Sequence, residues 1–428
     1  MRVLISGAGI AGPALVFWLA KAGAHITVVE KAPSLLPYGQ NVDITGSARS
    51  VIKKMGLKET VLQHNTTEKG SIFIDPKGRP FAPFPVREGS AASLTSEWEI
   101  LRGDLTKVLW EATKESENVE YLFGTTVNRV ISNDEECVKV ELSNGETYHY
   151  DLLVAADGQW SKVRKQCFPS ESITVLDKNM YVGYWTIPRL PEDNDWWNIY
   201  QALRSRIITL RPDPHGTIRA MFTLMPCNPE QKKAWQSASK NDRQTQEDLL
   251  RKEFADAGWQ AHRLLDAMDT APDFYFQAVQ QIKMDTWSRG RVICLGDTAF
   301  APTPLTGMGT SLAITGAYML AGELSKLQPS EHPARALEAY ENRFRHYVEE
   351  TQIHPSWVPG VAHPETELMR WMFGLLISAI SWLVSIEWLV RRFGKDDDLD
   401  DFVLPVYAAF DGQEKGQGNN GTTFVVGK

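Results

Sequence analysis

The sequence predicts an α/β protein in which a parallel sheet flanked by helices receives an inserted antiparallel sheet and ends in a C-terminal helix. Three observations predict this fold. A β-branched run at the N-terminus leads into closely spaced glycines and an apolar helix, and two later buried strands end in Asp-Gly or Gly-Asp pairs. The stretch between about Cys167 and Trp287 instead shows short strands separated by turn residues, which is typical of an antiparallel sheet.

The composition excludes several classes of protein. The 428 residues are 43% hydrophobic and 23% charged, enough for a sizeable core, and the net charge of -8 argues against a broad nucleic-acid surface. The histidines are dispersed, so no metal site is predicted. The four cysteines show no paired spacing, which indicates thiols in a reducing, cytoplasmic compartment: Cys137, Cys167, Cys227 and Cys294.

The first element is a strand, a glycine turn and a helix. RVLIS is followed by the G-x-G-x-x-G spacing of residues 7–12, the helix PALVFWLAKAG and a second strand, HITVVE. Glycines at these points permit a tight turn, close approach of a pyrophosphate and close helix–strand packing, and an acidic residue after the second strand can bind ribose hydroxyls. The interpretation as a signal peptide would remove these glycines by cleavage. The predicted dinucleotide-binding residues are Gly7, Gly9, Ala11, Gly12, Glu30 and Lys31.

Two later strands end in acidic turns. DLLVAADGQW ends at Asp157-Gly158, and RVICLGDTAF passes Asp297 into a proline- and glycine-rich loop and an apolar helix. Ligands of open α/β sheets bind at the carboxyl ends of strands. A carboxylate such as Asp297 can accept hydrogen bonds from ribityl hydroxyls, although a strand-end turn or helix cap would also explain it.

Together these motifs, spread from Gly7 to about Gly322, resemble the class A FAD-dependent monooxygenases, the para-hydroxybenzoate hydroxylase-like family. In size and motif placement the chain is similar to the tetracycline-inactivating flavin monooxygenases. The resemblance implies a Rossmann-like FAD-binding domain with an inserted antiparallel-sheet substrate domain and a C-terminal helix. It implies cofactor contacts from Asp43, Arg102, Asp157, Gly158, Asp297, Pro304, Gly307 and Gly309, in addition to the first motif. A surface ion pair is the alternative for Arg102, and the arginine often found near Asp43 is not obvious in the sequence.

The resemblance also implies a mechanism. NADPH or NADH would deliver hydride to flavin N5, and dioxygen would add at C4a to give a hydroperoxide that oxygenates a small apolar or aromatic substrate, such as a natural product. No catalytic residue is predicted, because the cofactor supplies the chemistry. Hydroxylation, epoxidation and Baeyer–Villiger insertion remain open. So do a halogenase, a reductase and a non-catalytic flavin-binding protein.

The domain boundaries follow from these patterns. The FAD-binding domain is expected at 1–72, 101–166 and 288–350, and the substrate domain at 73–100 and 167–287. A C-terminal helical segment at 351–410 and a flexible tail at 411–428 would follow. Aromatic side chains of the inserted sheet are predicted to line the substrate pocket, namely Trp185, Trp197, Tyr200 and Phe222.

The C-terminal segment contains an uncharged apolar stretch, WMFGLLISAISWLVSI, at 371–386. It falls short of the roughly 20 residues that span a bilayer, so we expect a helix packed across both domains. Two alternatives remain. The tryptophans and the following Arg391-Arg392 favour contact of residues 371–390 with a membrane surface, which would make the protein membrane-associated. A homodimer face is the other; a monomer is equally compatible with the sequence.

Overall fold

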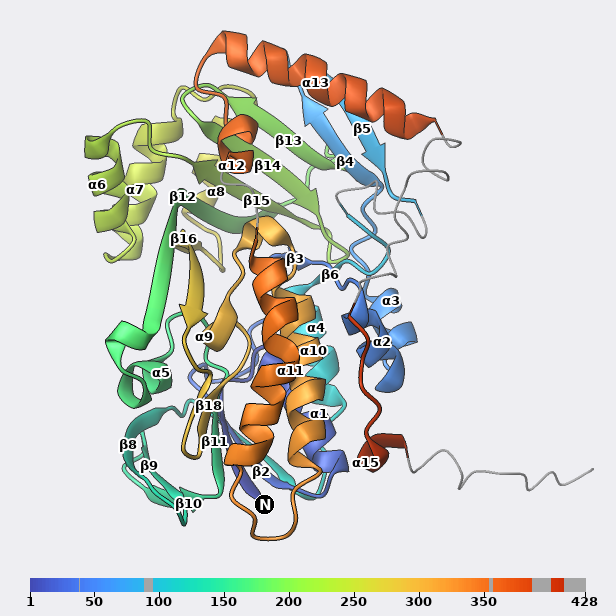
Figure 1. The fold of residues 1–428 in the computed structure, drawn as a ribbon. Coiled ribbons are helices and arrows are strands. Elements are labelled where there is room, and N and C mark those ends of the chain that lie inside the picture. The colour runs from blue at the N-terminus through green and yellow to red at the C-terminus, as the bar shows by residue number, and fades with distance from the viewer. Residues whose placement is uncertain (38, 88–94, 354–356, 387–401, 412–428) are drawn as a thin grey trace, which may run out of the picture.

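The computed structural model describes residues 1–37, 39–87, 95–353, 357–386 and 402–411 (Figure 1). Its lower half is built on a six-stranded sheet whose order is β17-β18-β11-β1-β2-β7. The strands pair in parallel except for β17 with β18. Their bounds are β1 (Arg2–Ser6), β2 (His25–Glu30), β7 (Val119–Phe123), β11 (Leu152–Ala155), β17 (Ser288–Arg289) and β18 (Val292–Cys294).

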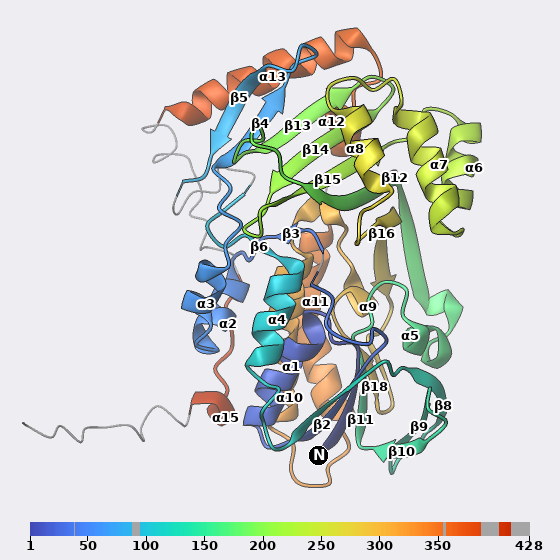
Figure 2. The ribbon, with the colours of Figure 1, turned by 180° about the vertical axis from the view of Figure 1, so that it is seen from behind.

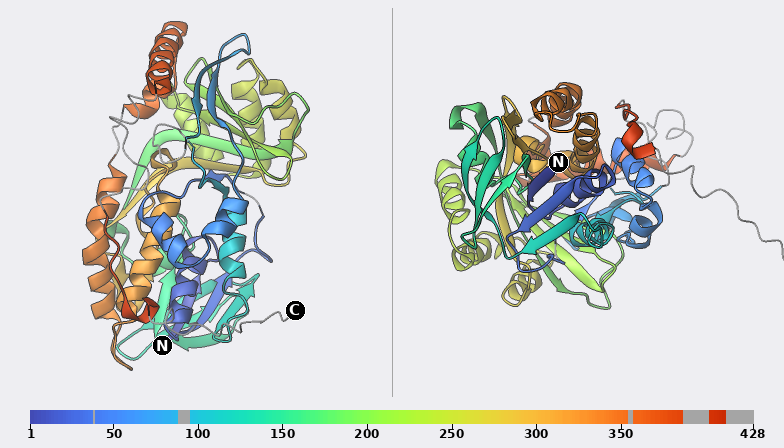
Figure 3. Two further views of the ribbon diagram at one scale, coloured as in Figure 1. Left: turned by 90° about the vertical axis from the view of Figure 1, so that its right-hand side faces the viewer. Right: turned by 90° about the horizontal axis from the view of Figure 1, so that it is seen from below.

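Helices and a small sheet cover this parallel sheet from opposite sides (Figure 3). The helices are α1 (Ala11–Lys21), α10 (Gly309–Leu324) and α11 (Ala334–Gln352), which pack on one another. The small antiparallel sheet consists of β8 (Val127–Asn133), β9 (Val138–Leu142) and β10 (Thr147–Tyr150). Fully buried residues of β1, β11 and α10 form one continuous apolar core, which fixes the strand ends that face the second half of the molecule.

The second half is a seven-stranded sheet with the order β16-β12-β15-β14-β13-β4-β5. All its neighbours are antiparallel except β13 with β4. The strands are β4 (Gly70–Ile74), β5 (Pro80–Pro85), β12 (Ile173–Pro188), β13 (Trp197–Ala202), β14 (Arg206–Pro212), β15 (Thr217–Leu224) and β16 (Tyr275–Met284). The outer face is covered by α6 (Pro229–Ala238), α7 (Arg243–Phe254) and α8 (Ala261–Met268), as Figure 2 shows.

This arrangement confirms the predicted fold of a Rossmann-like domain with an inserted antiparallel sheet. One expected boundary is displaced. The boundary at 72/73 cuts through β4, whose residues Ser71 and Ile72 already pair with β13. The displacement arises because strand pairing, which is a tertiary contact, decides to which sheet this short apolar segment belongs.

The C-terminal segment forms α12 (Val358–Ala362), α13 (Glu367–Ser385) and, after 402–407, α15 (Ala408–Asp411). The expectation that the apolar helix packs across both domains is wrong. Helix α13 lies along β5 at the end of the molecule far from the N-terminus (Figure 1), and the ring of its Phe373 packs 5.7 Å from that of Phe73. Only 6% of its most apolar 18-residue stretch is buried, because one side of the helix is sufficient to cover the sheet edge. The expected tail beyond Asp411 lies outside the described residues.

Candidate functional site

The glycine turn after β1 is a close-packed backbone structure. Gly7 has φ +111°, and a Cβ atom there would lie 2.5 Å from the carbonyl oxygen of Ala156. A Cβ atom at Gly12 would lie 2.0 Å from the carbonyl oxygen of Gly7. At Gly9 the nearest atom would be Nη2 of Arg102, 3.8 Å away. Two of the three glycines are therefore required by the fold, whereas Gly9 borders open space facing Arg102, where a pyrophosphate fits.

Glu30 closes the same turn at the end of β2. Its Oε2 accepts a hydrogen bond from the backbone N–H of Ala8 at 2.9 Å, and its Oε1 accepts one from Ala32 at 2.9 Å. The carboxylate is thus held against the glycine turn, within reach of a nucleotide lying on the start of α1. Lys31 is exposed beside it. Ala11 is buried as the first residue of α1, where its side chain would lie 3.1 Å from a Cβ atom built on Gly296.

Asp297 and Arg102 face each other across an interior recess. Asp297 starts the short helix α9 (Asp297–Phe300), and its side chain remains solvent-accessible. Burial nevertheless raises the pKa of Asp297, and the positive charge of Arg102 opposes this increase. A carboxylate that is both accessible and desolvated lines a recess inside the protein rather than the outer surface. Gly309, at the start of α10, borders the same carboxylate: its Cβ atom would lie 3.6 Å from Asp297 Oδ1.

The loop between α9 and α10 contains the remaining predicted residues of this region. Pro304 begins a 3-10 turn, Pro304–Thr306, and Gly307 follows with φ +67° and open space around its Cα. Thr303, which the sequence did not single out, has φ +91°, and its buried hydroxyl has no hydrogen-bond partner among the described residues. A left-handed threonine is costly, and such strain is concentrated at ligand sites. No sequence signal predicts it.

The Asp157-Gly158 turn is joined to the Asp297 turn by hydrogen bonds. The backbone N–H of Gly158 donates to Thr298 Oγ1 at 2.9 Å, and Arg164 Nη1 donates to the Thr298 carbonyl at 2.6 Å. Asp157 Oδ2 accepts from the Lys162 backbone at 3.1 Å, whereas its buried Oδ1 has no partner in the described structure. Burial raises the pKa of Asp157. The two acidic motifs therefore form one unit at the carboxyl end of the parallel sheet.

Asp43 and Arg102 lie at opposite ends of a two-stranded bridge, in which the backbone N–H of Arg102 donates to the carbonyl of Gln40. The bridge pairs β3 (Asn41–Val42) with β6 (Ile100–Leu101), directly before α4 (Arg102–Glu111). The Ser96 hydroxyl donates to Asp43 Oδ1 at 2.6 Å and accepts from Arg49 Nη2 at 3.2 Å. Buried Arg49 thus supplies the arginine near Asp43 that was not evident from the sequence. Its position on α2 (Ser47–Lys54) gave no indication of a contact with Ser96.

The prediction that four aromatic side chains line the substrate pocket is wrong for three of them. Trp185, Tyr200 and Phe222 are buried on the outer face of the seven-stranded sheet, under α7 and α8. Trp185 Nε1 donates to the carbonyl of Leu264 at 3.0 Å, and the Tyr200 hydroxyl donates to that of Ala257 at 3.0 Å. These rings serve the packing of the sheet against helices. Trp197 lies on the opposite, inner face, where its ring covers the Arg211 guanidinium at 4.1 Å.

The inner face that turns toward the recess presents the alternate residues of the same strands. Tyr275, Tyr184, Met221 and Thr209 form a row across β16, β12, β15 and β14. The rings of Tyr184 and Tyr275 lie 4.9 Å apart. Side chains alternate along a strand, so the prediction missed this row by one residue.

The row is connected to Arg102 through Gln40. The backbone N–H of Arg102 donates to the carbonyl of Gln40, and Gln40 Nε2 lies 3.6 Å from Met221 Sδ. Burial raises the pKa of Tyr184 and the pKa of Tyr275, and the charge of Arg102 lowers both. The inner face of the sheet therefore lies over the recess that contains Arg102 and Asp297.

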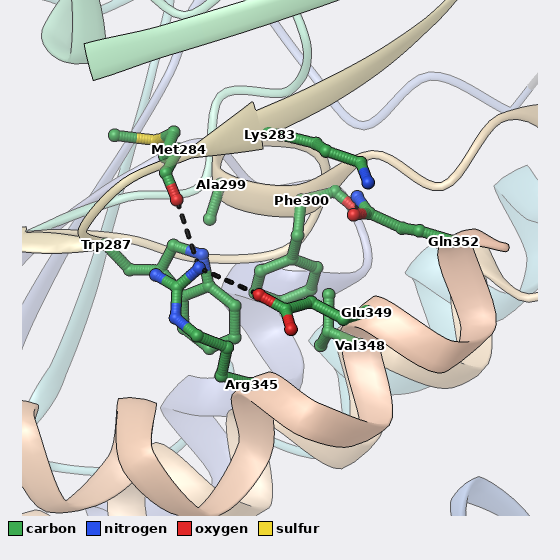
Figure 4. A pocket seen from close by; sticks show the side chains of 9 residues that line it. All are labelled: Lys283, Met284, Trp287, Ala299, Phe300, Arg345, Val348, Glu349 and Gln352. Atoms are coloured by element: carbon green, nitrogen blue, oxygen red, sulfur yellow. Dashed lines mark hydrogen bonds and ion pairs between the residues drawn. The ribbon is translucent and has the colours of Figure 1, made fainter.

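A separate small recess lies behind α9, between β16 and α11 (Figure 4). Two of its polar side chains already have partners: Arg345 Nη1 donates to the carbonyl of Met284 at 3.1 Å, and Gln352 Nε2 donates to that of Ile282 at 2.9 Å. The Arg345 guanidinium also covers the Trp287 ring at 4.7 Å. These contacts attach α11 to the substrate sheet, so we assign the recess a structural role.

The recess between the sheets fits FAD. Open space at Gly9, an accessible carboxylate at Asp297 and unpartnered oxygens at Asp157 and Thr303 all surround it. The start of α1 would hold the pyrophosphate and Glu30 the adenosine ribose. Asp297 would hold the ribityl chain, and the Gly307–Gly309 turn at the start of α10 would lie next to the flavin ring.

Comparison with known proteins agrees with this geometry. Residues 1–352 match the family described as FAD binding domain. The chain is 36% identical over 406 residues to Monooxygenase CTB7 of Cercospora beticola, covering 92% of this chain and 95% of that protein. It is 31% identical to FAD-dependent monooxygenase asL4 of Sarocladium schorii, covering 94% and 98%. The crystal structure of tetracycline destructase Tet(55) superposes with a TM-score of 0.74 at 28% identity, covering 95% of this chain and 98% of that chain. The chain belongs to the class A FAD-dependent monooxygenases.

Proposed function

We propose that this monooxygenase uses NADPH or NADH to oxygenate a small, largely apolar ring compound bound between the flavin site and the inner face of the seven-stranded sheet. The observation on which this proposal rests is the row Tyr275–Tyr184–Met221–Thr209, which faces Arg102 and Asp297. Aromatic and thioether side chains favour flat apolar ligands. The similarity to a tetracycline destructase, by name an enzyme that acts on a fused-ring molecule, supports the same substrate class.

Each group of the site has a defined task in this proposal. Bound FAD would supply the redox chemistry, namely acceptance of hydride from the nicotinamide and activation of dioxygen for transfer to the substrate. The sheet excludes water from the reacting atoms. The Tyr184 hydroxyl, which has no hydrogen-bond partner among the described residues, orients a polar group of the substrate. Arg102 places positive charge beside the flavin site, opposite Asp297.

The test uses the purified full-length protein loaded with FAD. We expect anaerobic NADPH or NADH to bleach the flavin absorption and oxygen to restore it. We also expect at least one compound from a panel of one- to four-ring phenols and ketones, tetracycline included, to increase nicotinamide oxidation and to gain one oxygen atom by mass spectrometry. Bound FAD that neither nicotinamide reduces would refute the proposed reductant. Reduction without oxygenation of any ring compound would refute the proposed substrate class.

A further inference from the structure

Helix α13 presents a continuous apolar surface to solvent. It is long and apolar enough, by length and composition, to cross a membrane, yet only 6% of its most apolar 18-residue stretch is buried. Trp371, Leu375 and Trp382 are 62%, 54% and 65% exposed. Six more large apolar side chains of the helix are exposed, namely Leu368, Met369, Met372, Leu376, Ile380 and Leu383, whereas the charged Glu367 is exposed at its first residue. Helices on the surface of soluble proteins normally carry polar residues on this side, so the apolar surface indicates a binding partner.

The exposed hydroxyls of this surface are satisfied within the helix. The Ser378 hydroxyl donates to the carbonyl of Gly374 at 2.7 Å, and the Ser385 hydroxyl donates to that of Trp382 at 2.6 Å. A protein–protein interface needs about one hydrogen bond per 100–200 Å² and a polar rim. A hydrocarbon environment instead requires that polar groups be paired internally. Beyond the charged Glu367 and Arg370 of its first turn, residues 371–385 meet the requirement for internal pairing. Their exposed side offers few hydrogen-bonding groups to a protein partner.

The positions of the two tryptophans indicate how the helix would lie. A residue advances by about 100° around an α-helix, so Trp371 and Trp382, 11 residues apart, project within about 20° of each other. By the same count they lie at one edge of the apolar arc, and Met372, Leu375 and Leu376 lie nearer its middle. Tryptophan favours the headgroup level of a bilayer and leucine the acyl region below it. Two indoles on one line set the helix axis parallel to the bilayer plane.

The contacts of α13 with the sheet exclude a membrane-spanning orientation. Ser381 Oγ donates to the carbonyl of Pro83 at 2.7 Å, and Arg87 Nη1 donates to that of Val384 at 2.7 Å. With the contact of Phe373 on Phe73 of β4, these contacts attach the helix along its length to the edge of the seven-stranded sheet, where β5 is the edge strand. A spanning helix would draw that open edge into hydrocarbon, where unpaired backbone groups are not tolerated.

We propose that α13 docks this enzyme on a lipid bilayer, lying in the plane of the interface with its Leu/Met side toward the acyl chains. The same helix packs on Phe73, Phe81 and Ile199 in one apolar cluster with β13 of the substrate sheet. The docked side of the molecule is therefore the substrate domain, and the FAD-binding domain is turned toward water (Figure 1). This inference concerns an interaction surface and does not depend on the identity of the substrate.

The test is flotation of the full-length, FAD-loaded protein with phosphatidylcholine vesicles in a sucrose gradient. We expect most of the wild-type protein to float, and 0.5 M salt to change its partition coefficient by less than about twofold, because apolar contacts are not screened. The double variant Leu375→Glu/Leu376→Glu should partition at least tenfold less. The matched control, Ile131→Glu/Leu190→Glu, replaces exposed apolar residues elsewhere and should float like the wild type.

A conservative variant guards against misfolding. Trp382→Phe keeps an apolar ring, and its flavin spectrum and nicotinamide oxidation should match those of the wild type. Quenching of tryptophan fluorescence by brominated phosphatidylcholine should be measurably weaker in this variant, because one indole at the interface is lost. Wild-type protein that stays at the bottom of the gradient would overturn the proposal. If that protein is also a dimer that Leu375→Glu/Leu376→Glu dissociates, a second copy of the chain is the partner instead.

Discussion

The FAD-binding half and the substrate sheet build their parts of the active site in different ways. In the first, the backbone shapes the site: Gly7 and Gly12 are required because any side chain would collide with neighbouring carbonyl oxygens. In the second, side chains shape it, and adjacent residues such as Tyr184 and Trp185 point to opposite faces of β12. A site made by the backbone has a fixed residue spacing in the sequence. A site made by a sheet face depends on which side the helices cover, and that is decided by tertiary packing.

The largest effect on FAD binding is expected for Gly12→Ala. Its Cβ atom would lie 2.0 Å from the Gly7 carbonyl oxygen, which is backbone and cannot rotate away. Overpacking of this kind costs about 1–3 kcal/mol or more, so we expect FAD affinity to fall roughly 10- to 100-fold, measured by fluorescence titration of the apoprotein. The free energy of unfolding of the apoprotein separates this crowding from a direct effect on the cofactor. Gly12→Ala should lower it, whereas Gly9→Ala should leave it unchanged, since its Cβ atom would lie 3.8 Å from the nearest atom, a side-chain nitrogen. Equal losses of apoprotein stability in both variants would contradict the role of crowding at Gly12.

This contrast also explains how much could be predicted from the sequence. The nucleotide site followed from the spacing of Gly7 to Gly12 and from the strand ends at Asp157 and Asp297, because each motif encodes local backbone geometry. The contact of Arg49 with Ser96 and the left-handed Thr303 could not be predicted, since each depends on segments distant in the chain or on strain with no residue signature.

The predicted pocket failed for a related reason. Aromatic residues of an antiparallel strand are equally suited to either face of the sheet. Which face is covered depends on helices α6 to α8, which follow later in the chain. Likewise the apolar stretch of α13 predicted a helix correctly, but its composition could not show that only one side is used to cover the sheet.

A buried ion cluster on the inner face should give the largest effect on the free energy of unfolding. Arg211 donates to Glu68 Oε2 at 2.7 Å and also to Glu99. The pKa of Glu68 is raised by its burial, and the pKa of Glu99 is lowered by Arg211 despite burial. Arg211→Ala leaves two carboxylates without their cation and should reduce the free energy of unfolding by about 3–5 kcal/mol in urea. Arg129→Ala, which removes an exposed partner of Glu141, should cost under about 1 kcal/mol. If both variants lost a similar free energy of unfolding, burial would not be what makes the Arg211 cluster important.

His363 attaches α12 to the substrate sheet and should make stability depend on pH. Its Nδ1 lies 2.7 Å from the carbonyl of Pro359 and its Nε2 lies 2.9 Å from Thr223 Oγ1, and burial lowers its pKa to about 4. The unfolded chain binds the proton below about pH 6.5, the native state only below about pH 4. The contribution of this histidine is therefore intact above pH 6.5 and is lost as the pH falls to 4, by about 3 kcal/mol in total. His363→Gln should make the free energy of unfolding depend less on pH over this interval. If the pH dependence is unchanged in the variant, it arises from other titrating groups.

The smallest effects should separate the two faces of β12 most sharply. Tyr184→Phe removes only a hydroxyl from the inner face, so we expect the free energy of unfolding to stay within about 0.5 kcal/mol of wild type. The lost substrate hydrogen bond should raise KM about threefold to tenfold, which corresponds to about 0.5–1.5 kcal/mol. Trp185→Phe, at the next residue of β12, should change stability and not KM. It leaves a cavity and removes the hydrogen bond from the indole to the Leu264 carbonyl, so it should destabilise the fold by about 1–3 kcal/mol while KM stays unchanged. Urea unfolding and steady-state kinetics with the best compound of the panel measure both variants. If Trp185→Phe raises KM and Tyr184→Phe does not, the assignment of the inner face is wrong.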